Sequence, residues 1–286
     1  MVMKMAAMIE LTGIVQKFGN HEVLKDISLT IEKGEIFGLL GPSGAGKTTL
    51  IKIVTGQLKP TAGSAVTDGK NAAGLRGSEY RRIGMMMDGL GLYGRLSCYD
   101  NLKLFTKIYG ISESRIHEVL EKVGLSEAEK RPAEKLSKGM RGRLSFARAV
   151  LNEPAILFLD EPTSGLDPAT TNRIHEMILE EQAKGTTIFL TTHNMAEAEK
   201  LCQHVALLHE GTIVEYGEPK EICRKYNHQN KLKIRLSDGR CLEMGNERSA
   251  AEAVREYLQQ GMIETIHSTE PNLETVFMEL TGRSLV

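Results

Sequence analysis

The sequence lacks any apolar run long enough to cross a lipid bilayer, which takes roughly 20 consecutive residues. Its best apolar run, residues 155–159, has only the length of a buried strand. Residues 1–9 are apolar with one lysine, but neither a long hydrophobic region nor a small-residue cleavage site follows them. We therefore expect no membrane span and no secretion signal, so any contact with a membrane has to come through a partner.

Cysteine is scarce, and charge of either sign is dispersed along the chain. The cysteines show no metal-ligand spacing and are too few for a disulfide scaffold in 286 residues, so we interpret them as free thiols in a reducing cytoplasm. The formal net charge is -1, without any run of five or six like charges. This balance argues against a nucleic-acid surface and against a polybasic membrane patch.

The composition that remains is that of a globular protein with a sizeable core, at 41% hydrophobic and 26% charged residues. Short apolar runs alternate with helical patterns over the first two thirds, which is typical of α/β domains whose parallel strands are covered on both faces. We expect the first such strand at residues 35–40, a helix at 47–54, and further strands at 155–160 and 186–191.

Two further regions differ from this alternating pattern. Residues 89–152 carry helical spacing and predict a helical subdomain. From about residue 231, alternating apolar residues on either side of Asp238-Gly239 predict a hairpin. Ser249 and Glu252 predict a capping box before a helix that Gly261 ends, and a last helix follows. We therefore expect a main domain over 8–226 and a small α+β domain over 231–286, joined by the polar stretch 227–230.

A glycine-rich motif lies between the first predicted strand and helix. The sequence GPSGAGKT at residues 41–48 fits the pattern G-x-x-x-x-G-K-[ST] in the strand-loop-helix context that this pattern requires. Such a loop curls its amide groups around a phosphate, its lysine reaches the terminal phosphates, and its hydroxyl suits Mg²⁺. The predicted nucleotide-binding residues are Gly41, Pro42, Ser43, Gly44, Ala45, Gly46, Lys47, Thr48 and Thr49.

Two carboxylates close a later predicted strand. Asp160 ends the apolar run Phe158-Leu-Asp160 and is expected to form the magnesium site together with Thr48. Glu161 comes next and would face the attacking water as a general base. His193 ends another predicted strand, where it would hydrogen-bond the γ-phosphate. The phosphate loop alone does not distinguish a kinase, a GTPase, a helicase and a transporter ATPase.

The order of the motifs narrows these alternatives. The phosphate loop is followed by LSKGM at 136–140, FLDE at 158–161, SGLD at 164–167 and Thr192-His193. In this set the chain resembles the ABC ATPases over residues 9–217. The resemblance implies a P-loop core with a mixed sheet, ATP and Mg²⁺ as ligands, and hydrolysis by Glu161, His193 and Lys47. A P-loop kinase or GTPase does not account for this set.

The resemblance also implies that two subunits enclose the nucleotide. Ser137 and Gly139 begin a helix that would meet the ATP held by a second copy of the chain, and Asp167 would help to hold the copies together. Phe18 is similar to the aromatic residue that stacks on adenine; the alternative is an ordinary core position.

Two positions depart from the family pattern. Asp88 stands where the family has a glutamine that contacts the metal and the water, and we expect it to ligate Mg²⁺ or orient water. The signature carries Lys138 and Met140 in place of glycine and glutamine, while Ser137 and Gly139 are kept.

The signature and the C-terminal segment 270–283 are similar to the ABC exporter subgroup that handles antibiotics, peptides or lipids. This likeness implies a separate transmembrane permease subunit, docking near residues 93–101, and a place on the cytoplasmic face of the cell membrane. The alternative is a soluble ABC switch acting on ribosomes or DNA, which usually has two cassettes or a basic surface. The small C-terminal domain would regulate the motor, brace the dimer or lengthen the interface.

Overall fold

The structure is a computed structural model that describes residues 6–87, 91–228 and 230–282. Contacts divide the chain into two compact units, one ending at Tyr216 and the other beginning at Gly217. The division comes before the predicted linker at 227–230, because helix α8, Pro219–Lys225, packs against α10, Leu273–Thr281, of the second unit. The boundary between the two units therefore lies between Tyr216 and Gly217, whereas the sequence predicted it after residue 226.

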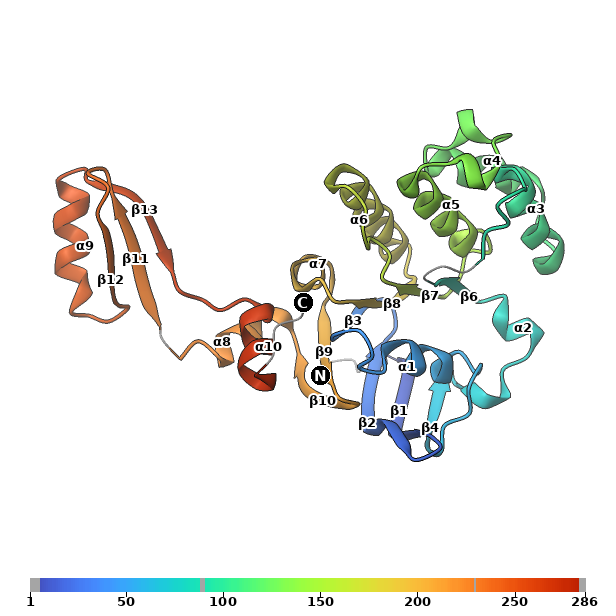
Figure 1. Cartoon of the computed structure of the whole chain (residues 1–286), viewed down its shortest axis with the longest axis horizontal. Coiled ribbons are helices and arrows are strands. Elements are labelled where there is room, and N and C mark those ends of the chain that lie inside the picture. The colour runs from blue at the N-terminus through green and yellow to red at the C-terminus, as the bar shows by residue number, and fades with distance from the viewer. Residues whose placement is uncertain (1–5, 88–90, 229, 283–286) are drawn as a thin grey trace. The chain divides into compact units, whose positions relative to one another are not determined.

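The first unit is built around a sheet with the strand order β10-β9-β3-β8-β7-β6 (Figure 1). Strands β9, β3, β8, β7 and β6 run parallel. The central strands are buried from end to end, so they read as continuous apolar runs. The strands are Ile36–Leu40 (β3), Ile83–Met86 (β6), Ile156–Asp160 (β7), Thr187–Thr192 (β8), His204–His209 (β9) and Thr212–Gly217 (β10).

A second, antiparallel sheet has the order β2-β1-β4-β5. Its strands are Ala7–Phe18 (β1), His21–Glu32 (β2), Ala62–Thr67 (β4) and Lys70–Asn71 (β5). The first two precede the strand predicted as the first of the chain. The sequence pattern does not reveal these strands. The pairing of β1 with β2 shifts register at several points, and this breaks the strict alternation of side chains along the strand. Apolar side chains of both sheets and of helix α1, Lys47–Val54, form one core.

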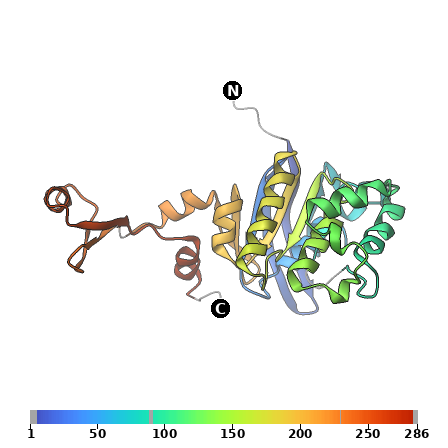
Figure 2. The ribbon, with the colours of Figure 1, turned by 90° about the horizontal axis from the view of Figure 1, so that it is seen from above.

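The middle part of the first unit's sequence forms helices. Residues 98–150 form a group of helices, green in Figures 1 and 2, as expected for the predicted helical subdomain. Helix α5 of this group packs against β6 and so joins the group to the main sheet. The remaining helices of this unit are Gly77–Tyr80 (α2), Cys98–Tyr109 (α3), Ser114–Lys122 (α4), Lys138–Val150 (α5), Pro168–Ala183 (α6) and Met195–Leu201 (α7).

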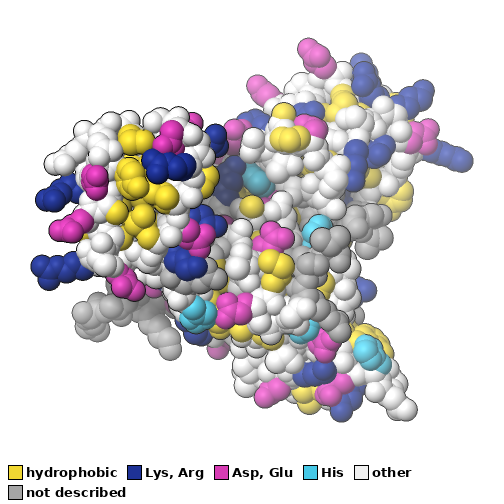
Figure 3. Space-filling view, turned by 60° about the vertical axis from the view of Figure 1, so that its left-hand side comes forward, with side chains coloured by type: hydrophobic (Ala, Val, Ile, Leu, Met, Phe, Trp, Pro, Cys, Tyr) yellow, Lys and Arg dark blue, Asp and Glu magenta, His cyan; other side chains and the backbone are white. Residues whose placement is uncertain are grey.

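The second unit contains a three-stranded antiparallel sheet and a helix. The strands are Lys231–Leu236 (β11), Cys241–Gly245 (β12) and Ile263–Ser268 (β13), in the order β12-β11-β13, and the helix is Ala250–Gln259 (α9). The predicted hairpin and both predicted helices are present. Strand β13 was not predicted, because most of its side chains are exposed and carry no apolar alternation. Figure 3 shows an apolar patch on this unit with charged side chains around it. Leu258 of α9 is 60% exposed.

The predicted capping box at Ser249 is wrong. Ser249 has helical backbone angles and its hydroxyl makes no capping hydrogen bond. A capping serine needs an extended backbone to turn its oxygen toward the amides of the first turn.

Candidate active site

Strand β3 and helix α1 position the glycine-rich loop. The strand is fully buried, and α1 begins at Lys47 with Gly46 before it at a φ of 112°. No side chain caps this helix, so its first amide groups remain available for an anion. Glycine at position 41 is required by packing, because a Cβ there would lie 2.2 Å from the carbonyl oxygen of Leu208.

A groove of about 460 Å³ opens over this loop. Its walls are Val23, Pro42, Ser43, Gly44, Gly46, Lys47, Thr48, Thr49, Asp160 and Glu161. The ammonium of Lys47 donates to the carbonyl oxygen of Gly41 at 2.6 Å and lies 3.3 Å from Glu161 Oε1. A phosphate arriving in the groove would therefore compete with Glu161 for this cation.

Asp160 lies at the end of β7 between two hydroxyl groups. Thr48 Oγ1 donates to Asp160 Oδ2 at 3.3 Å, and Thr191 Oγ1 donates to Oδ1. The parallel register of β7 and β8 sets Asp160 opposite Thr191. Thr191 was not predicted as a site residue, because strand register cannot be read from the sequence around it.

The Thr48 and Asp160 oxygens fit a magnesium ion. Mg²⁺ takes oxygen ligands and commonly uses one or two protein groups together with phosphate oxygens. The described residues contain no cluster of three or more His, Cys, Asp and Glu side chains that would hold a metal ion alone. This donor set therefore suits a metal ion that enters with a nucleotide.

Glu161 and His193 are in direct contact. His193 Nδ1 lies 2.7 Å from Glu161 Oε2, while the other carboxylate oxygen faces Lys47. The two residues follow neighbouring parallel strands, β7 and β8, whose carboxyl ends meet at one edge of the sheet. The structure thus brings the three predicted catalytic side chains into one network.

The predicted signature residues lie at the start of α5. Ser137 precedes the helix, and its hydroxyl accepts a hydrogen bond from the amide of Met140 at 3.2 Å. A Cβ at Gly139 would lie 3.0 Å from the side chain of Thr170 on α6. Neither residue lines the phosphate groove of its own chain. Lys138, which lies between them, lines a separate cavity together with Asp160 and Glu161.

Asp167 caps helix α6 in the single chain. Its carboxylate accepts hydrogen bonds from the hydroxyl and the amide of Thr170, and these bonds hold the pKa of Asp167 below its ordinary value. Phe18 ends β1 with its ring 52% exposed, which excludes the alternative of a core position. Asp88 lies outside the described residues.

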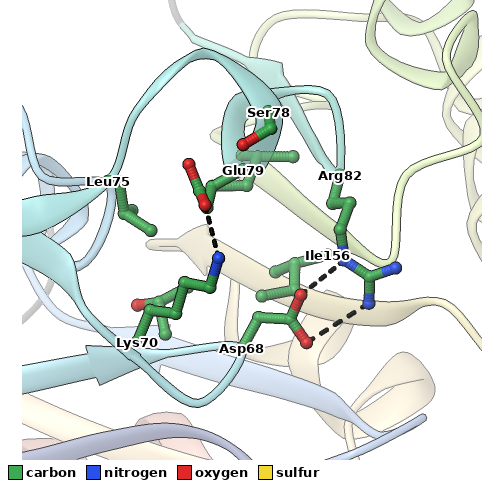
Figure 4. A pocket seen from close by; sticks show the side chains of 9 residues that line it. Asp68, Lys70, Leu75, Ser78, Glu79, Arg82 and Ile156 are labelled. Atoms are coloured by element: carbon green, nitrogen blue, oxygen red, sulfur yellow. Dashed lines mark hydrogen bonds and ion pairs between the residues drawn. The ribbon is translucent and has the colours of Figure 1, made fainter.

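A second polar pocket lies away from the catalytic edge (Figure 4). Lys70 pairs with Glu79, and Arg82 pairs with Asp68. The hydrogen bond from Lys70 lowers the pKa of Glu79 to about 2. The pocket also touches Ile156, the first residue of β7, whereas Asp160 ends that strand. Nucleotides bind at the carboxyl ends of such strands, so this pocket is not part of the nucleotide site.

Comparison with known proteins agrees with this geometry. The family model described as ABC transporter matches residues 24–164. A fluoroquinolones export ATP-binding protein of Mycobacterium tuberculosis is 40% identical over 266 residues, which cover 92% of this chain and 88% of that protein. A lantibiotic transport ATP-binding protein of Streptococcus pyogenes is 36% identical, covering 78% of this chain and 97% of the relative. A methionine import ATP-binding protein of Listeria monocytogenes is 39% identical, covering 77% and 69%.

Solved structures show the same fold. The dimeric ATP-binding cassette MJ0796, in a post-hydrolysis state with ADP and Pi, has a TM-score of 0.68 and 27% identity, covering 74% of this chain and 98% of the cassette. The expected fold class, a P-loop core with a small added domain, is therefore confirmed for the core. With the phosphate loop, Asp160, Glu161 and His193 gathered at one edge of the sheet, the chain belongs to the ABC transporter family, as one of its ATP-binding, ATP-hydrolysing subunits.

Proposed function

We propose that two copies of this chain enclose ATP and Mg²⁺ and power export through a separate transmembrane permease subunit. The observation that carries the proposal is the network in which Glu161, on the wall of the phosphate groove, contacts both Lys47 of that groove and His193. Ser137 and Gly139 begin a different helix and do not line that groove. A second copy would supply them to the nucleotide, and the relative MJ0796 is itself dimeric.

The roles of the side chains follow from their positions. Lys47 and the amides of the loop hold the β- and γ-phosphates, and Thr48 with Asp160 would hold the metal ion. When bound, Mg²⁺ offsets the negative charge of the phosphates. Glu161 Oε2 takes a proton from the attacking water, and His193 orients that carboxylate and contacts the γ-phosphate. The exposed ring of Phe18 would stack on adenine.

Export is the direction that the relatives favour. The export protein matches 92% of this chain, whereas the import protein matches 77%. The cargo we propose is a small molecule, a peptide or a lipid. No helix within the described ranges combines the length and the apolar character that a membrane crossing needs.

We assign the docking of the permease to the region around Tyr93. This ring is 58% exposed, and Ile108 on the following helix α3 is 65% exposed. Exposed large apolar side chains of this kind favour a protein contact in this region. The chain would then act on the cytoplasmic face of the membrane.

Co-expression with the membrane protein of the neighbouring reading frame tests this proposal. We expect the two proteins to copurify and cells to export a fluorescent drug in an ATP-dependent manner. The Glu161→Gln variant should copurify equally and export nothing. Absence of a complex, with ATP hydrolysis by a monomer at full rate, would contradict both the assembly and the transport function.

A further inference from the structure

The catalytic carboxylate sits on a strained backbone. Glu161 has a φ of 50°, in the left-handed region that residues other than glycine rarely adopt. Such a conformation persists only where the surrounding structure holds it in place. On the side of the sheet, the amide of Glu161 donates to the carbonyl oxygen of Thr191 at 3.0 Å. On the side where the chain leaves the strand, the amide of Ser164 donates to the carbonyl oxygen of Glu161 at 3.2 Å and closes a turn, which a second anchor ties to the neighbouring helices.

That second anchor is Thr163, two residues after Glu161. Its hydroxyl donates to Glu197 Oε1 at 2.7 Å, and the same oxygen lies 2.9 Å from His175 Nε2. Glu197 is on α7, the helix that follows His193, and it is 2% exposed. His175 is on α6, which follows the capping residue Asp167. One buried carboxylate oxygen therefore joins the three segments that carry Glu161, Asp167 and His193.

The polar cluster is not explained by stability. Glu197 Oε2 and His175 Nδ1 are buried and have no hydrogen-bond partner among the residues that the structure describes. A buried polar atom without a partner is destabilising, and an apolar replacement of the same shape is often neutral or stabilising. The contacts to Glu197 therefore serve to position the segments that they join, and not to stabilise the fold.

We infer that Glu197 is a positioning residue for ATP hydrolysis. It does not line the phosphate groove. It acts through Thr163 to hold the turn that aims the Glu161 carboxylate, and through its own helix to keep His193 beside that carboxylate. The inference rests on the proposed role of Glu161 as the base.

The first test replaces Thr163 in the full chain. Thr163→Val keeps the shape and removes the donated hydrogen bond, whereas Thr163→Ser keeps the hydroxyl. A displacement of a catalytic group by about 1 Å lowers the rate roughly a hundredfold. We expect Thr163→Val to lower kcat at least about tenfold while KM for ATP stays within about twofold, because the phosphate loop is untouched. Thr163→Ser should retain most of the activity.

The second test removes the acceptor and uses a matched control. Glu197→Leu should lower kcat as Thr163→Val does, and the double variant should be no worse than the more damaged single variant, because both changes remove the contact between Thr163 and Glu197. Glu181 is an equally buried glutamate on α6, paired with Lys122 and Lys184. Glu181→Gln should lower the urea midpoint of unfolding and leave kcat unchanged.

The outcomes separate this inference from the proposed function. Wild-type kcat in Thr163→Val would overturn the inference, as would equal losses in Thr163→Val and Thr163→Ser. A rise in KM that accounts for the whole effect would also overturn it. If Glu161→Gln hydrolyses ATP normally, the assignment of the base itself fails, whatever the Thr163 variants show.

Discussion

His193 Nδ1 lies 2.7 Å from Glu161 Oε2, and the opposite oxygen of the same carboxylate lies 3.3 Å from Lys47 Nζ. One carboxylate therefore faces both the phosphate-binding lysine and the histidine. A nucleotide that draws Lys47 toward its phosphates would weaken the first contact and leave the carboxylate to His193 and the attacking water. The loss of the Lys47 contact by Glu161 would thus couple nucleotide binding to ATP hydrolysis.

Glu161→Gln is expected to bind ATP and to trap a closed dimer while hydrolysis is nearly lost. The amide cannot accept a proton from water, and loss of a general base lowers the rate by about 10²–10⁴-fold. Phosphate release and the mass of the particle in ATP check the two effects. Glu176→Gln is a control, since that exposed carboxylate pairs with Arg173 on the surface of α6. Normal turnover in Glu161→Gln would show that another group is the base.

His193→Ala should lower kcat much more than it lowers nucleotide affinity. The change removes the 2.7 Å contact that orients Glu161, but it removes nothing from the walls of the phosphate groove. Steady-state kinetics together with fluorescent ATP binding separate the two quantities. An affinity loss as large as the loss in kcat would mean that His193 acts mainly in binding.

The phosphate loop and the two carboxylates could be predicted from the sequence because each belongs to a short continuous segment of the chain. Residues 41–48 form a loop between a strand and a helix, and Asp160 and Glu161 directly follow an apolar run, so spacing alone locates them. The contact of Asp160 with Thr191 depends on the register of two strands far apart in the chain, which no local pattern encodes. The cluster around Glu197 depends on the packing of two helices and was missed for the same reason.

Asp88→Gln is expected to keep or raise the rate of ATP hydrolysis. A glutamine keeps an oxygen donor, has greater reach and removes one negative charge near the phosphates, if position 88 serves as it does in related ATPases. The measurement is kcat at saturating magnesium and ATP. A collapse of activity would show that the carboxylate itself is required, and Asp88→Asn separates the effect of charge from that of length.

Gly41→Ala and Gly44→Ala test why the loop needs glycine. A Cβ at position 41 would meet the carbonyl oxygen of Leu208 at 2.2 Å, so the backbone of the loop has to shift. Position 44 has a φ of 83° but open space around it, so alanine there costs only about 1–2 kcal/mol of conformational energy. We expect Gly41→Ala to lower the urea midpoint and abolish ATP binding, and Gly44→Ala to cause a smaller loss of stability. Equal stability losses would contradict the packing explanation.

Truncation tests where the second unit begins. Helix α8 packs against α10, and its Ile222 is buried. A chain ending at residue 226 keeps α8 but removes α10, which exposes apolar surface, whereas a chain ending at Gly217 removes both. We expect the shorter chain to be the more soluble, with a sharp thermal unfolding transition and nucleotide affinity like that of the full chain. Light scattering and calorimetry decide the outcome, and better behaviour of the chain ending at 226 would show that α8 belongs to the first unit.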